Sequence, residues 1–164
     1  METMKVYHIS MKDLGSRPDI YPSIPDTMSQ CENSTTPRIC VCPTIPGCIM
    51  AKELTHDLKS EDDVINFYVY EARILSDHII QPTYADVFDA WYTGELWVTE
   101  PYTFELFGLY QLRKQMDVGE SCYSRYSITN HYDKDGIIDR VKASPIYGDC
   151  ICFSMIDSDK FKSV

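Results

Sequence analysis

Several features are missing from this sequence, and each absence argues against one class of protein. No apolar run approaches the roughly 20 residues that a membrane-spanning helix needs, so no transmembrane segment is predicted. The first ten residues, METMKVYHIS, lack the basic segment followed by an apolar stretch that marks a signal peptide. Internal repeats and low-complexity segments are also absent. We therefore expect a cytoplasmic protein that does not engage a membrane, and repeat architectures are excluded.

Basic residues are scarce in the middle of the chain. Residues 61–120 hold three basic and twelve acidic residues, net −9, whereas residues 1–60 and 121–164 have net charges of −1 and 0. Phosphate repulsion opposes direct binding of nucleic acid to such a segment. An acidic surface suits a basic partner, including a protein that itself binds nucleic acid, and a merely solubilising surface is the alternative. The partner-binding residues expected here are Glu61, Asp62, Asp63, Asp86 and Asp89.

The cysteines do not form a recognisable metal or disulfide pattern. There are seven, an odd number, whereas a secreted disulfide framework favours an even count. Two C-x-C pairs, Cys40 with Cys42 and Cys150 with Cys152, fall in predicted strands. Structural zinc sites favour C-x₂₋₄-C knuckles, so this spacing disfavours zinc. A nucleophilic cysteine needs an activating base and exposure, and no histidine is tied to one of them. Buried packing is the preferred interpretation.

Length and composition predict one folded domain. The chain has 164 residues, of which 44% are hydrophobic, which is enough for one core and short for two. We expect a single domain over residues 1–164. Prolines punctuate residues 14–37, so this stretch is predicted to be irregular, as a lid or flap.

The expected fold class is α+β, a mixed or antiparallel sheet with one main helix. Alternation and β-branched or aromatic content predict strands over residues 4–10, 38–42, 64–73, 95–100, 103–112, 122–129, 137–142 and 149–156. Thr44 is a candidate N-cap for a helix that runs to about Asp57, and a shorter helix is expected within residues 84–91. The second strand has apolar residues on both faces, so we expect it to be central and buried.

Arg38 stands at the head of the second predicted strand, directly after a proline. An arginine in this position is suited to clamp a carboxylate or phosphate of a ligand. The alternative is a surface arginine at a strand end, paired with Glu32. The sequence leaves these two interpretations open.

Three segments together resemble small proteins of the ADP-ribosyltransferase fold: VYHIS followed by a proline-rich stretch, RICVCPTIPGCIMAKEL, and TGELWVTEPYTFELFGLYQL. The resemblance covers roughly residues 4–58 and 93–112. Some phage-encoded anti-CRISPR proteins of similar size use this fold. The combination PRICVxPTIxGC with TGELWV is also similar to small proteins of phages and mobile elements.

The resemblance implies particular site residues and a cofactor. His8 would hold the adenosine side of NAD, with Arg38 as a second binding residue. Thr44 would take the place of the Ser or Thr that follows the second strand. Glu95 would be the catalytic carboxylate, which orients the nicotinamide ribose and stabilises a developing oxocarbenium charge. The Ser-Thr-Ser triplet and E-x-E motif are absent, and only GEL at residues 94–96 stands in for the latter.

Two functional hypotheses follow. The preferred one is a small acidic phage-type inhibitor that acts in the host cell cytosol against a defence system. It would bind a basic nucleic-acid-binding partner, such as a nucleic-acid-guided nuclease, or a nucleotide signal. The alternative is an NAD-dependent ADP-ribosyltransferase that modifies a protein or a nucleic acid. The sequence indicates no oligomeric state.

Overall fold

The computed structural model divides into two compact units. Unit 1 comprises residues 1–51 and 69–107, and unit 2 comprises residues 52–68 and 108–164. The structure describes residues 1–26, 32–52, 54, 64–87, 90–115, 126–132, 138–145 and 150–155.

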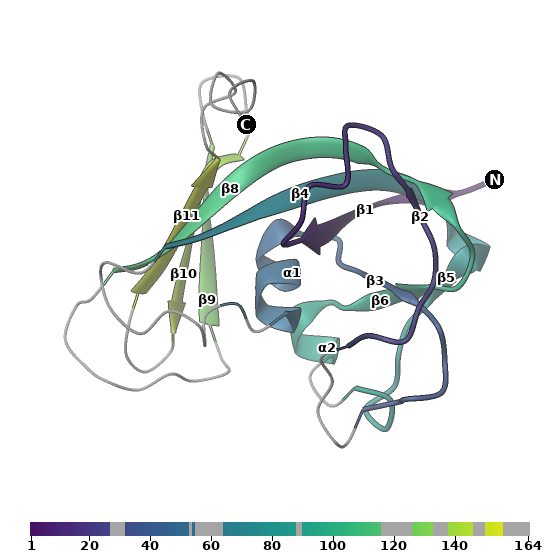
Figure 1. The fold of residues 1–164 in the computed structure, drawn as a ribbon. Helices are drawn as coiled ribbons and strands as arrows, with labels where there is room; N and C mark the ends of the chain where they lie inside the picture. Colours follow the sequence, from purple (N-terminus) through teal and green to yellow (C-terminus); the bar gives the residue numbers. More distant parts are fainter. Residues whose placement is uncertain are drawn as a thin grey trace. The chain divides into compact units, whose positions relative to one another are not determined.

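Unit 1 contains most of the short elements. They are β1 (Thr3–Ser10), β2 (Asp19–Ile20), β3 (Ile39–Val41), α1 (Ile45–Ala51), η2 (Ser76–His78), β5 (Ile79–Ile80), α2 (Ala90–Thr93), β6 (Leu96–Val98) and β7 (Tyr102–Thr103) (Figure 1). Two longer strands contribute residues to both units, β4 (Val64–Leu75) and β8 (Glu105–Gln115). Unit 2 adds β9 (Tyr126–Tyr132), β10 (Ile138–Pro145) and β11 (Cys150–Met155).

The sheets are mostly antiparallel. The largest has six strands in the order β1-β4-β8-β11-β10-β9, and within unit 2 the pairs β8–β11, β11–β10 and β10–β9 are all antiparallel. Strands β2 and β7 form a two-stranded sheet, and β3, β6 and β5 form a three-stranded one in that order. The expected α+β class with mostly antiparallel sheets and one main helix is therefore confirmed. None of the helices in the described ranges is both long and apolar enough to cross a membrane.

The middle strand of the three-stranded sheet of unit 1, β6, is buried on both faces. Trp97 in the middle strand pairs with Cys40 on one side and Ile80 on the other, and Val98 pairs with Ile39 and Ile79. Trp97 is 2% exposed and Val98 0%. Because directly paired residues share a face, Cys40, Trp97 and Ile80 line one face, and Ile39, Val98 and Ile79 line the other.

The second predicted strand is buried but not central. β3 lies at one end of the three-stranded order, so the expectation of a central strand is wrong. Isolated bridges cover its outer edge instead, Ser23 with Arg38 before the strand and Tyr7 with Cys42 after it. These bridges satisfy backbone groups that a flanking strand would otherwise satisfy.

Helix α1 begins where the sequence predicts and ends sooner. The Thr44 hydroxyl oxygen accepts a hydrogen bond from the Gly47 amide at 3.1 Å, which is the expected N-cap. The helix ends at Ala51, and Lys52 already lies in a turn, so the expected extension to about Asp57 is wrong. Leu54 is still buried, at 5% exposure, but in a 3₁₀ turn. Apolar spacing thus predicted the burial but not the conformation.

The described part of the proline-rich stretch is tied to the body of unit 1. The Leu14 amide donates to the Tyr70 hydroxyl at 2.8 Å. The Pro18 carbonyl accepts from the Phe104 amide at 2.9 Å. Tyr70 and Phe104 are both fully buried. The stretch is largely irregular, as predicted, apart from the two residues of β2.

Candidate functional site

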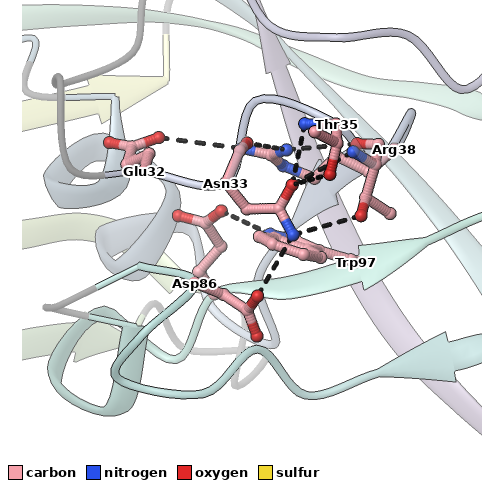
Figure 2. A network of polar contacts seen from close by, with 8 residues as sticks. Glu32, Asn33, Thr35, Arg38, Asp86 and Trp97 are labelled. Atoms are coloured by element: carbon pink, nitrogen blue, oxygen red, sulfur yellow. Dashed lines mark hydrogen bonds and ion pairs between the residues drawn. The ribbon is translucent and has the colours of Figure 1, made fainter.

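The buried guanidinium of Arg38 is the centre of a partly buried polar network (Figure 2). Its side chain is 0% exposed. Nη1 donates to the backbone carbonyls of Asn33 at 2.8 Å and Thr36 at 3.1 Å, and Nη2 lies 3.7 Å from a carboxylate oxygen of Glu32. The guanidinium carbon lies 4.1 Å from the centre of the Trp97 ring. This arginine is thus stacked, hydrogen-bonded and ion-paired, as a buried cation requires.

Trp97 joins a buried cation to a buried anion. Its ring face lies against Arg38, and its indole nitrogen donates to a carboxylate oxygen of Glu95 at 2.8 Å. Glu95 is only 7% exposed. Residues 95 and 97 are two apart in an extended segment, which puts both side chains on one face. The indole N–H therefore supplies a charge-assisted hydrogen bond to a carboxylate that is largely withdrawn from water.

Asn33 connects this network to a second loop. Its side-chain nitrogen donates to Asp86 at 3.1 Å and to the Thr36 hydroxyl at 3.1 Å, while its side-chain oxygen accepts the backbone amides of Thr35 and Thr36 at 2.9 and 3.0 Å. Its own backbone amide donates to the Asp86 carbonyl at 2.9 Å. Side-chain and backbone hydrogen bonds of Asn33 therefore connect residues 32–38 to the turn at Asp86 (Figure 2).

Asp86 closes a tight turn with Thr83. One carboxylate oxygen accepts both the backbone amide and the hydroxyl of Thr83, each at 2.9 Å. These bonds from Thr83, with the bond from Asn33, hold the pKa of Asp86 below its usual range. A lowered pKa means that Asp86 stabilises the fold above its unfolded-state pKa and loses that contribution as the pH falls through the folded-state pKa. Tyr84 in the same turn is 76% exposed.

Two cysteines beside the network, Cys40 and Cys42, have raised pKa values. Burial, with the nearby Glu95 charge, raises the pKa of Cys40 to about 12, against the opposing effect of Arg38. A hydrogen bond with Cys48, together with burial, also raises the pKa of Cys42. The Cys48 thiol donates to the Tyr7 carbonyl at 3.2 Å. Because a thiolate is the nucleophilic form, this environment favours packing over catalysis.

Native-state alkylation tests this assignment. At pH 8 we expect iodoacetamide to modify Cys40 on the order of a hundredfold more slowly in the folded protein than in urea, because the thiolate is suppressed and the residue is partly buried. The raised pKa stabilises the fold below pH 9 and the contribution is lost as the pH rises toward 12. Peptide mass mapping would measure the rate, and equal rates in both states would contradict a partly buried, neutral thiol at Cys40.

The other residues predicted as a cofactor site have structural partners. The imidazole of His8 hydrogen-bonds through Nδ1 to the Cys40 carbonyl at 2.9 Å, and its ring packs edge-on against Phe104, 5.9 Å between centres. Thr44 caps α1. Arg38 stacks on the ring face of Trp97, and Glu95 accepts a hydrogen bond from its indole N–H. The structure thus brings Arg38 and Glu95 into one cluster around Trp97. The imidazole of His8 binds the backbone carbonyl of Cys40 in β3.

Among the predicted partner-binding acids, Asp86 lies within the described residues, and its carboxylate accepts the hydrogen bonds from Thr83. Glu61, Asp62, Asp63 and Asp89 lie outside the described residues. Sequence reasoning missed Trp97, although its spacing from Glu95 was a usable signal. It also missed the contact of Asn33 with Asp86, which has no local signal because the two residues are 53 apart in the sequence.

These residues do not fit an NAD site. Arg38 is fully covered and bound to carbonyls and a carboxylate of the protein, and Glu95 is almost fully covered beside Trp97. No step involving NAD is derived from them. Within the described ranges, no group of three His, Cys, Asp or Glu side chains is placed to hold a metal ion.

A groove lined mostly by charged residues lies elsewhere on unit 1. It has a volume of about 390 Å³ and is lined by Lys5, Glu71, Ala72, Arg73, Thr103 and Glu105. Lys5 forms an ion pair with Glu71 at 2.7 Å, and this hydrogen bond raises the pKa of Lys5. The lining holds two positive and two negative side chains, so it offers a ligand little net charge to neutralise.

No protein-family model, curated protein or solved structure matches this chain.

Proposed function

We propose that this chain is a small acidic phage-type inhibitor that binds a basic, nucleic-acid-binding host protein stoichiometrically, in the host cell cytosol. The proposed partner is a nucleic-acid-guided nuclease of a host defence system. The resemblance to small phage proteins of the ADP-ribosyltransferase fold supports this class of function, with the fold serving as a scaffold. The observation that carries the proposal is the charge of unit 1, which contains five basic and twelve acidic residues, net −7.

The location of these charges favours an interaction surface. Of the acidic residues described in unit 1, only Glu95 is buried. Arg38 is also buried, so one of the five positive charges is withdrawn from the surface. The exposed carboxylates are those of Glu2, Asp13, Asp19, Asp26, Asp77, Glu100 and Glu105. Exposed carboxylates attract a basic protein and compete with the phosphates that it normally binds.

The alternative, an NAD-dependent ADP-ribosyltransferase, has less support. The side chains of its candidate residues Arg38, Glu95 and His8 are already hydrogen-bonded to other groups of the protein. A catalytic carboxylate should reach substrate, whereas Glu95 is 7% exposed.

A displacement assay tests the proposal. The purified chain is titrated into each of a panel of guide-loaded nucleases that hold labelled target DNA, without NAD. We expect release of DNA at one chain per nuclease, with affinity that weakens at least about tenfold between 50 and 300 mM salt, because exposed charges are screened. The proposal would be contradicted by an affinity that does not change with salt, or by a failure of the chain to displace DNA from any nuclease of the panel.

Glu95→Gln is the matched control for catalysis. It keeps a side-chain oxygen for the Trp97 indole and leaves the exposed carboxylates unchanged. We expect inhibition equal to that of the wild type. If the variant binds the nuclease normally but no longer inhibits it, and wild-type inhibition requires NAD, the transferase alternative replaces the binding proposal.

A further inference from the structure

We propose that strand β5 and the turn after it form a docking surface, on which an extended, Lys- and Arg-containing segment of the partner protein adds as a further strand. This inference rests on the proposed function and specifies where the basic partner binds. The surface, called the β5 surface below, comprises Asp77, Ile80, Tyr84 and Glu100.

Strand β5 offers a backbone edge. It pairs with β6, and β3 lies on the far side of β6. In the part of the chain that the structure describes, no other strand pairs with β5, whereas the outer edge of β3 is covered by two bridges. An edge strand presents backbone donors and acceptors that an extended peptide can meet.

Two exposed apolar side chains mark this edge. Ile80 in β5 is 43% exposed, although its cross-strand partner Trp97 is 2% exposed. Tyr84, four residues further on, is 76% exposed. Tyrosine buries a large area with few rotatable bonds, and it is enriched among the residues that dominate binding energy. Tyr84 is therefore suited to act as the anchor of the β5 surface.

The polar network holds the turn that presents Tyr84. Thr83 and Asp86, which flank Tyr84, are joined by two side-chain bonds at 2.9 Å and by a backbone bond at 3.0 Å. Asp86 is bound in turn by Asn33 through side chain and backbone, and the Asn33 carbonyl is bound by buried Arg38. A side chain on a fixed turn loses less conformational entropy on binding. The network of Figure 2 thus preorganises an exposed anchor.

The charge around this edge determines the chemistry of the partner. Asp77 precedes β5 and Glu100 follows β6, and both are exposed. Because Ile79 at the start of β5 pairs with Val98 at the end of β6, the two carboxylates belong to the same end of the strand pair. The sequence holds no Lys or Arg between residues 74 and 112. A partner strand with basic side chains is therefore favoured over a neutral or acidic one.

Selection from a phage-displayed library of random decapeptides on the intact protein tests this inference. We expect enriched peptides that alternate apolar residues with Lys or Arg. Each is then synthesised twice, unmodified and with alternate backbone nitrogens methylated, which keeps the charge but removes donors to the β5 edge. Methylation is expected to weaken binding at least about tenfold.

Two tyrosine variants separate the β5 surface from general charge attraction. Tyr84→Ala is expected to weaken peptide binding at least about tenfold, as for a hot-spot residue. Tyr21→Ala removes a tyrosine that is 67% exposed but lies next to β2, and it should leave affinity unchanged. Thermal unfolding of both variants would confirm that they are folded, since neither side chain is part of the core.

The outcomes distinguish this inference from the proposed function. Equal affinity of methylated and unmodified peptides, or of Tyr84→Ala and wild type, would overturn the β5 surface. Recovery of no basic peptide from the library would also overturn it. In each case the displacement of DNA from the nuclease panel decides separately whether the chain binds a basic partner through another surface.

Discussion

Replacing Arg38 by alanine should lower the free energy of unfolding of unit 1 by about 3 to 5 kcal/mol, the usual cost of breaking a buried ion pair by removing one partner. The substitution removes the cation stacked on Trp97 and two hydrogen bonds, to the carbonyls of Asn33 and Thr36. It also removes the charge that faces Glu32 and leaves a cavity beside the indole. Both tryptophans of the chain lie in unit 1, so urea denaturation followed by tryptophan fluorescence measures the relevant transition.

Arg17→Ala is the matched control. Arg17 also faces a carboxylate, Glu105, at 3.9 Å, but the two side chains are 73% and 67% exposed. An exposed pair contributes little, so the expected change is under about 0.5 kcal/mol. Arg38→Lys should fall between the two because lysine keeps the charge but lacks the planar, multiply donating group. If Arg38→Ala and Arg17→Ala cost the same, the buried network does not stabilise unit 1 in the way described.

The strands were the most predictable part of this protein, because their signal is local. Alternation and aromatic content predicted residues 64–73 as a strand, and β4 occupies Val64–Leu75. The start of α1 was equally readable, since a threonine cap needs only the next turn. The helix end was not, because the buried Leu54 continues the apolar spacing while the backbone has left the α-helix. The two-residue strand β2 depends on its pairing with β7, which no local pattern encodes.

The candidate site was predictable only in its charged members. Pairing of Arg38 with Glu32 was one of two interpretations from sequence, and the pair is present at 3.7 Å. The expectation that such an arginine lies at the surface is wrong, because Trp97 covers it. Stacking and burial depend on which strand lies beside β3, and the pairing of Cys40 with Trp97 spans distant parts of the sequence. Sequence reasoning therefore found the ionisable residues but not the aromatic and amide groups that connect them.

Replacing Gly47 by alanine should destabilise unit 1 by about 2 to 3 kcal/mol, although alanine is the better helix former. A Cβ atom built on Gly47 would lie 2.3 Å from the backbone carbonyl oxygen of Thr93, at the end of α2, and 3.3 Å from the Cβ of Cys42. The neighbour at 2.3 Å is backbone, so relief requires the helices to separate, as in other overpacked cores. Helix propensity alone would favour alanine by about 1 kcal/mol. The steric cost must exceed that gain for the protein to lose stability.

Gly15→Ala isolates the other way in which a glycine resists substitution. Gly15 has a φ of +91° but nothing within 4 Å of a built Cβ, so its replacement costs only backbone strain, about 1 to 2 kcal/mol. Tryptophan fluorescence in urea would rank the variants, with Gly47→Ala as the less stable. A Gly47→Ala protein that is more stable than the wild type by about 1 kcal/mol would mean that propensity alone acts at this position. In that case α1 would not lie as close to the Thr93 carbonyl as described, because a helix cannot gain stability while its new methyl group overlaps a carbonyl oxygen.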